Sequence, residues 1–239
     1  MKGAFEATES MRLLFFGRAE CEFSQSLLVE SAKIGFDVTY VESSYRGETL
    51  PESVFEWEGD FIFCFRSLFV LPNRLLLKAQ SGAINFHPGP PEYPGSGCVN
   101  FALYDDVREF GVTAHLINEK IDNGRILTVR RFPVDEDDGL DDILLRTHRE
   151  LACLCSYFLT QVDVHGEEFI KKQLASASSE VWRGEARKIK DLEELQRLSL
   201  DISEDELRRI IRATYTESFP PWIELHGFKF FLSIDDSAG

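Results

Sequence analysis

The sequence predicts an α/β fold in which a mostly parallel β-sheet carries helices on both faces, followed by a small C-terminal α+β subdomain made of a helix and a β-hairpin. Short apolar runs alternate with stretches whose apolar residues recur at helical spacing, and this alternation is typical of parallel sheets. From about residue 176 the chain becomes polar and charged. We therefore expect an N-terminal extension over residues 1–10, the α/β domain over 11–175 and the subdomain over 176–239.

Each element has its own signal. Residues 11–17 (MRLLFFG) read as a buried opening strand, and the amphipathic stretch after it ends at a helix-closing glycine, Gly35. Pro72 predicts a helix over 72–80, because proline suits the first helical position. The other predicted elements are strands at 36–41, 60–65, 83–86, 111–117 and 125–134, helices at 98–105 and 140–162, a helix capped by Ser203 and a hairpin around residues 226–227.

Composition indicates a soluble, cytoplasmic protein. Of the 239 residues 44% are hydrophobic and 28% are charged, and the first ten lack the apolar centre of a signal peptide. No apolar run approaches the ~20 residues that span a membrane. The five cysteines are scattered and odd in number, as in intracellular proteins. With 26 basic and 41 acidic residues the net charge is −15, which disfavours a nucleic acid as partner.

Metal ions and dinucleotides are not expected as cofactors. Cys153 and Cys155 lie in an apolar helical stretch that supplies no further ligands. The acidic run at 135–142 precedes a helix, where carboxylates meet the positive helix end. The opening strand runs into FFGRAE, and a single glycine is not the three-glycine fingerprint of a dinucleotide site.

Asn85 and His87 are the candidate catalytic residues. They are two apart at the end of a predicted strand, so their side chains point to the same face, and Pro88 biases His87 towards an extended conformation. A carboxamide and an imidazole on one face form an oxyanion clamp, and the imidazole also handles a proton. Asp122, in the turn KIDNG, is well placed to orient the histidine. The alternative is that these polar side chains only satisfy backbone groups where a loop begins.

Together with the segments that follow, this motif resembles a known family. The segment 85–88 (NFHP), the proline- and glycine-rich loop 89–97 and the segment 111–127 (GVTAHLINEKIDNGRIL) are similar to the hallmark of the folate-dependent formyltransferases, and the whole is most like the sugar N-formyltransferases. The resemblance implies a Rossmann-like fold and assigns the family's asparagine, histidine and aspartate to Asn85, His87 and Asp122. It also implies 10-formyltetrahydrofolate as co-substrate, without a metal.

The resemblance extends to binding residues. In the family, two loops hold the pterin of the carrier, and their counterparts here contain Arg66, Ser67, Leu68, Phe69 and Leu71, and Asn118, Glu119 and Ile121. The loop expected over the acceptor contributes Glu92, Tyr93, Ser96 and Gly97, with His115 as a further candidate contact. Core packing at 68–71 and a buried strand histidine at position 115 remain the alternatives.

For the acceptor, the resemblance favours the amino group of a nucleotide-linked amino sugar and a homodimeric enzyme. The tail offers Trp182, Arg183, Arg212 and Trp222 as stacking or phosphate-pairing groups, although aromatic residues in a small hairpin are also typical of a subunit interface. Methionyl-tRNA is disfavoured, because the chain has no room for the extra barrel of those enzymes and carries an acidic charge. Glycinamide ribonucleotide, an amino-acid derivative, methionyl-tRNA, or a non-catalytic folate-binding role are the alternatives.

Overall fold

The computed structural model describes residues 10–234, so the predicted extension at 1–10 lies almost wholly outside the described residues. Six strands form one sheet in the order β2-β1-β3-β4-β5-β6. The first four are parallel, whereas β5 runs antiparallel to β4, and β6 antiparallel to β5. The strands are β1 (Arg12–Arg18), β2 (Asp37–Ser43), β3 (Gly59–Phe65), β4 (Ala79–His87), β5 (Glu109–Leu116) and β6 (Ile126–Pro133).

Three helices cover one face of the sheet, namely α1 (Glu22–Ile34), α4 (Leu140–His165) and α5 (Glu167–Ser176). Side chains on a strand alternate between faces, so every second strand residue points into this layer. The ring of Phe86 lies 5.3 Å from that of Phe63 and 5.6 Å from that of Phe158 on α4, measured between centroids. These fully buried aromatic residues form the centre of the larger core.

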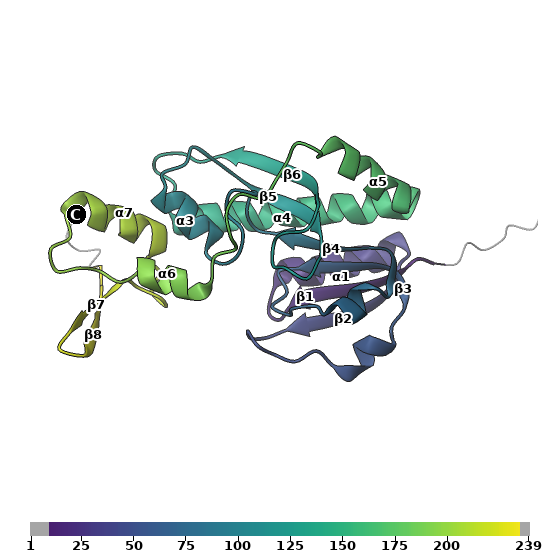
Figure 1. Cartoon of the computed structure of the whole chain (residues 1–239), viewed down its shortest axis with the longest axis horizontal. Coiled ribbons are helices and arrows are strands. Elements are labelled where there is room, and N and C mark those ends of the chain that lie inside the picture. The colour runs from purple at the N-terminus through teal and green to yellow at the C-terminus, as the bar shows by residue number, and fades with distance from the viewer. Residues whose placement is uncertain (1–9, 235–239) are drawn as a thin grey trace, which may run out of the picture.

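Shorter elements cover the opposite face, namely the 3-10 helix η1 (Glu52–Glu56) and α2 (Asn73–Leu76). Leu14 and Phe16, which alternate with the residues of the first face, pack here with Leu75 of α2. The short helix α3 (Cys98–Tyr104) packs instead with the start of α4 and with Phe110 of β5. With helices on both faces and a mostly parallel sheet, the predicted fold class is confirmed (Figure 1). The helix predicted over 72–80 is shorter, because Ala79 already pairs with Gly59 of β3 and begins β4.

The C-terminal part consists of α6 (Ile189–Leu195), α7 (Glu204–Thr214), β7 (Trp222–Leu225) and β8 (Phe228–Phe231). Ser203 caps α7 as predicted, since its hydroxyl accepts from the Glu206 N–H at 3.2 Å. Ala213 of α7 is fully buried and joins the core around α3. The β7–β8 hairpin projects away from the sheet (Figure 1). The boundary at 176 stays a prediction.

The structure adds three elements that the sequence did not predict: η1, α5 and α6. Within residues 10–234, no helix is both long and apolar enough to cross a membrane.

Candidate active site

The candidate site lies where β4 ends beside β5. Asn85 of β4 pairs in register with His115 of β5, so the two side chains project on the same side of the sheet. Asn85 Nδ2 lies 3.1 Å from His115 Nε2. His87 follows two residues later on the same strand face, and its side chain, like that of His115, is only 3% exposed. The structure therefore brings both predicted strand residues to one point, together with His115.

Asp122 lies at the centre of these side chains. Its carboxylate accepts from Asn85 Nδ2 at 3.3 Å and from the Gly95 N–H at 2.8 Å, and it lies 3.2 Å from His87 Nδ1 and 3.3 Å from His115 Nε2. Burial alone would raise the pKa of Asp122, but the charge of His87 and the hydrogen bonds with both imidazoles hold this pKa well below its ordinary value. Asp122 is therefore charged at neutral pH, and its carboxylate fixes its neighbours.

The backbone at Asp122 is strained. Its φ of 42° lies in the left-handed region, which residues other than glycine seldom adopt. The surrounding structure must hold such a residue in place, and conformations of this kind are frequent at functional sites. Here the strained turn directs the carboxylate towards β4.

Both ring nitrogens of His87 face hydrogen-bond acceptors. Nδ1 faces Asp122 Oδ2, and Nε2 lies 2.9 Å from the backbone carbonyl oxygen of Tyr93. Burial alone would lower the pKa of His87, but the Asp122 charge, the Asp122 hydrogen bond and the Tyr93 carbonyl outweigh it and raise this pKa. Because both neighbours are acceptors, the network assigns His87 as a doubly protonated imidazolium. A cation beside the Asn85 amide is suited to stabilising negative charge on a substrate oxygen.

The predicted acceptor contacts already have partners within the protein. Glu92 accepts two hydrogen bonds from the Arg131 guanidinium, at 3.1 and 3.2 Å, and the Tyr93 hydroxyl donates to Asp105 at 2.9 Å. The Ser96 N–H donates to the carbonyl of Arg187, while Gly97 lies at the start of α3. Their contact with an acceptor stays a prediction, and the backbone of this loop, more than its side chains, lies next to the site.

The first predicted folate loop follows β3. Arg66 has a φ of 55° and directs its guanidinium to the sulfur of Cys21, 3.3 Å away. The Leu68 N–H donates to the Ser43 hydroxyl at 2.8 Å, and the Phe69 N–H donates to the Ser67 hydroxyl at 3.3 Å. Ser67 is thus held by the loop itself. Phe69 and the buried Leu71 belong to the apolar cluster beneath η1 and α2. Core packing therefore explains part of the apolar character of residues 68–71.

The second predicted folate loop follows β5. Asn118 accepts from the Lys120 N–H at 3.0 Å, which closes a tight turn. Glu119 is exposed, and Ile121 is 61% exposed although it is apolar. The residue just before this loop, Ile117, joins the same core as Phe69. Phe69 and Ile117 thus bring the two loops to one apolar cluster, and the contact of the loops with folate stays a prediction.

Two backbone groups that the sequence could not reveal, and one tail residue that it named, complete the site. The Tyr93 carbonyl and the Gly95 N–H are backbone groups, which no residue pattern marks. The Trp182 ring packs against both imidazoles from a distant segment. Of the other three tail residues named for ligand binding, Arg183 lies 3.6 Å from Glu92, whereas Arg212 pairs with Asp106 at 2.8 Å and Trp222 lies in the hairpin.

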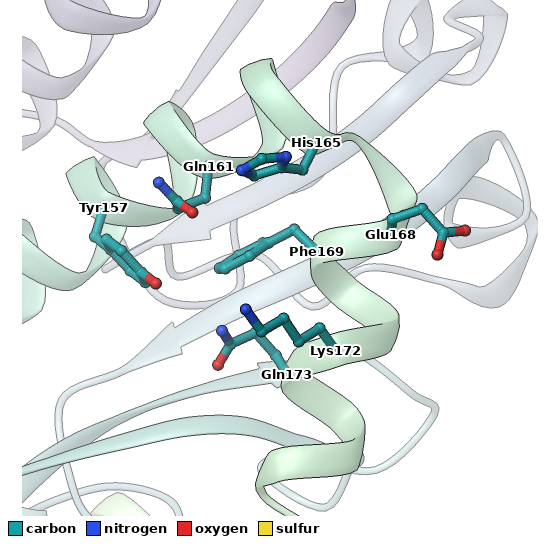
Figure 2. A pocket seen from close by; sticks show the side chains of 7 residues that line it. All are labelled: Tyr157, Gln161, His165, Glu168, Phe169, Lys172 and Gln173. Carbon is teal, nitrogen blue, oxygen red and sulfur yellow. The ribbon is translucent and has the colours of Figure 1, made fainter.

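One cavity of the described residues lies apart from this site. A cavity of about 190 Å³ between α4 and α5 is lined by residues that are all outside the site (Figure 2), namely Tyr157, Gln161, His165, Glu168, Phe169, Lys172 and Gln173. Among the described residues, no group of three or more His, Cys, Asp or Glu side chains is arranged to hold a metal ion.

Comparison with known proteins decides the class of this chain. The family model described as formyl transferase matches residues 16–154, which is more than half of the sequence. The chain belongs to the formyl transferase family. A methionyl-tRNA formyltransferase of Listeria innocua serovar 6a is 35% identical over 101 residues, which make up 42% of this chain and 32% of that protein. The chain thus spans about a third of the length of the curated relatives it matches.

Solved structures of formyltransferases resemble nearly the whole chain. A sugar N-formyltransferase from Shewanella sp FDAARGOS_354 has a TM-score of 0.68 at 19% identity and covers 94% of this chain and 97% of that one. An N-formyltransferase from Helicobacter canadensis, solved with folinic acid and dTDP-3-aminofucose, has a TM-score of 0.65 at 15% identity and covers 91% and 85%. The shared fold therefore extends beyond the family match into the C-terminal part.

Proposed function

We propose that this formyl transferase moves the formyl group of 10-formyltetrahydrofolate onto the amino group of a nucleotide-linked amino sugar. The observation that carries the proposal is the convergence of Asn85, His87 and Asp122 at the end of β4. An amide donor beside a protonated imidazole stabilises the charge that develops on a formyl oxygen. One donor of this kind typically contributes about 3–4 kcal/mol in the transition state.

In the proposed reaction the acceptor amine, as its free base, attacks the formyl carbon. A carbon–nitrogen bond forms while the carbonyl electron pair moves to oxygen, next to Asn85 and His87. When this oxyanion collapses, the bond to the folate nitrogen breaks, and that nitrogen gains the proton that the amine loses. The charge and hydrogen bond of His87 lower the pKa of Asp122, so Asp122 orients His87 as a carboxylate.

The amide of Asn85 has to change partner during this reaction. Its Nδ2 donates to Asp122 at 3.3 Å, which is long for a hydrogen bond to a charged carboxylate. A weak bond of this length is readily exchanged for one to a developing oxyanion. His87 keeps its bond to Tyr93 and contributes through its charge, because both of its ring nitrogens are already occupied.

Two further observations support a nucleotide-linked sugar as acceptor. The C-terminal part is shared with sugar N-formyltransferases over nearly the whole length of both chains. The guanidinium of Arg183 is 70% exposed and lies 3.6 Å from Glu92 of the loop expected over the acceptor, where it can reach an anionic group. A bound nucleotide would add binding energy remote from the reacting amine and help to position it.

The proposal is tested by offering the chain 10-formyltetrahydrofolate with a panel of amines and detecting formylated product by mass spectrometry. The panel contains dTDP-linked amino sugars, the same sugars without nucleotide, glycinamide ribonucleotide, an amino-acid derivative and methionyl-tRNA. We expect a nucleotide-linked sugar to react, and removal of its nucleotide to lower kcat/KM by at least about a hundredfold.

Each other outcome selects an alternative. Efficient formylation of methionyl-tRNA would overturn the sugar assignment but keep the chemistry, and it is the outcome suggested by the 35% identical relative. Binding of 5-formyltetrahydrofolate in calorimetry without transfer to any amine would favour a folate-binding protein. Absence of both binding and transfer would refute the proposal altogether.

We also propose that the chain forms a homodimer through the β7–β8 hairpin. Phe228, Phe230 and Phe231 are 70%, 53% and 62% exposed, and Phe219 just before the hairpin is 74% exposed. A two-stranded hairpin on its own is only marginally stable in water, so we expect a second copy of the chain to bury this apolar surface.

We expect sedimentation to give a dimer for the parent chain and a monomer for the double variant Phe228→Ser, Phe231→Ser. Val29→Ser, at an apolar residue that is 51% exposed on α1, is the control and should leave the dimer intact.

A further inference from the structure

Residues 180–188, which we call the strap, return from α5 to lie along the proline-rich loop at 88–97. The backbones of the two segments pair: the Arg183 N–H donates to the Pro91 carbonyl at 2.8 Å, and the Arg187 N–H donates to the Pro94 carbonyl at 3.0 Å. The Ser96 N–H in turn donates to the Arg187 carbonyl at 2.8 Å. The strap therefore behaves as an additional strand laid against the loop that contributes Tyr93 and Gly95 to the site.

Side chains hold the strap at the same place. Arg131 of β6 binds Glu92 of the loop and also lies 3.4 Å from Glu180 at the start of the strap. Arg183 lies 3.6 Å from the same Glu92. Ion pairs that are partly exposed contribute little one by one, but this network joins three segments and fixes the direction in which residue 182 points.

Trp182 is the strap residue whose ring contacts the histidines of the site. Its ring centroid lies 5.6 Å from that of His87 and 5.0 Å from that of His115, with interplanar angles of 73° and 86°. Its indole N–H donates to the Gly124 carbonyl at 2.7 Å, two residues after Asp122 in the strained turn. A single side chain thus contacts both histidines and the turn that carries the carboxylate.

Trp182 is half-buried and belongs to none of the three apolar clusters of the described residues, and its neighbours along the strap are exposed. Val181 is 63% exposed and the Arg183 side chain is 70% exposed. An aromatic residue that served only to anchor the strap would pack among apolar side chains, whereas Trp182 packs edge-to-face on two imidazoles and uses its single polar atom on the Asp122 turn.

We propose that Trp182 is a positioning residue for formyl transfer, which fixes the rings of His87 and His115 and keeps water from their hydrogen bonds to Asp122. Its expected effects on kcat and KM rest on the proposed function. The χ2 torsion of histidine is broad, so hydrogen bonds alone leave a ring room to tilt, and a packing partner removes that freedom. Excluding water also strengthens the electrostatic interactions that remain.

The first test needs no substrate. Proton NMR can follow the Nδ1–H of His87, assigned by its loss in His87→Asn, and its exchange with water. We expect this proton to exchange at least about tenfold faster in Trp182→Leu than in the parent chain, and at an intermediate rate in Trp182→Phe, because local access of water sets the exchange rate. Val181→Ala, at the exposed neighbouring position, is the matched control and should exchange like the parent.

The second test uses the reaction. A misplaced catalytic group costs rate more than binding, so kcat should fall by about tenfold to a hundredfold in Trp182→Leu with KM for folate nearly unchanged. Trp182→Phe keeps an aromatic ring and should recover most of the loss. A residue that only stabilised the fold would lower the melting temperature without this split between kcat and KM.

The outcomes separate this proposal from the proposed function. Unchanged exchange of the His87 proton in Trp182→Leu, or a change confined to KM, would overturn the role of Trp182 even in an active enzyme. If the parent chain formylates no amine, the proposed function fails, while the exchange measurement still decides whether Trp182 shields the histidine. Should Trp182→Leu fail to fold, the comparison of Trp182→Phe with Val181→Ala decides in the same way.

Discussion

Replacing Asp122 with asparagine is expected to lower the turnover number of formyl transfer by about a hundredfold or more. The carboxylate bonds to His87, the Asn85 amide and the Gly95 N–H. An asparagine has nearly the same shape, but it is neutral and one of its two polar ends is itself a donor. At this position that donor would face other donors. The His87 cation and the Asn85 amide would therefore lose the group that fixes them.

Steady-state kinetics measures this effect. In Asp122→Asn, kcat should fall while KM for the folate changes by less than about threefold. An NMR titration should also find the pKa of His87 lower than in the parent, because the charge and hydrogen bond that raise it are removed. Asp137→Asn is the matched control, since Asp137 is exposed and outside the site, and it should change neither quantity. Near-normal turnover in Asp122→Asn would show that formyl transfer does not depend on this carboxylate.

Helices and strands could be predicted from the sequence where apolar residues recurred over a long stretch or where a capping residue marked an end. The helix predicted at 140–162 has apolar residues at helical spacing along its whole length, and in the structure it continues a little further, to His165. The short helix α6 lies in a polar, charged stretch and has no buried residue, so no periodic apolar pattern marked it. The helix predicted after Pro72 is shorter than expected because its last predicted residues, from Ala79, belong to β4 and pair with β3. Long-range pairing of this kind overrides local propensity.

For the site, sequence reasoning reached the side chains but not the groups that surround them. Asn85 and His87 could be placed on one face because side chains on a strand alternate, and the turn with Asp122 follows the next strand. The Tyr93 carbonyl, which occupies His87 Nε2, is a backbone atom and leaves no trace in the residue pattern. Trp182 could be named as a candidate contact, but its position over two histidines follows from pairing between segments more than ninety residues apart.

Gly124→Ala should have the second large effect, on both stability and turnover. Gly124 is buried in the turn after Asp122, and a Cβ built there would overlap the carbonyl oxygen of Leu116 and lie 3.3 Å from His115 Nδ1. That same Leu116 carbonyl lies 2.9 Å from His115 Nδ1. Because the overlap is with backbone and not with a flexible side chain, the turn and the end of β5 must move apart. The shift would also disturb the bond that Trp182 makes to the Gly124 carbonyl.

We expect Gly124→Ala to lower the free energy of unfolding by about 2 kcal/mol or more, measured by chemical denaturation. In the fraction that stays folded, kcat should fall by about a hundredfold, because a catalytic group displaced by roughly 1 Å loses that much rate. Gly139→Ala is the control: its φ is −90°, and the nearest atom to an added Cβ is Asp142 Oδ2 at 3.4 Å, so a methyl group fits. A stable and fully active Gly124→Ala would mean that the turn tolerates displacement, and the close packing of Asp122 against β4 and β5 would then not be required for transfer.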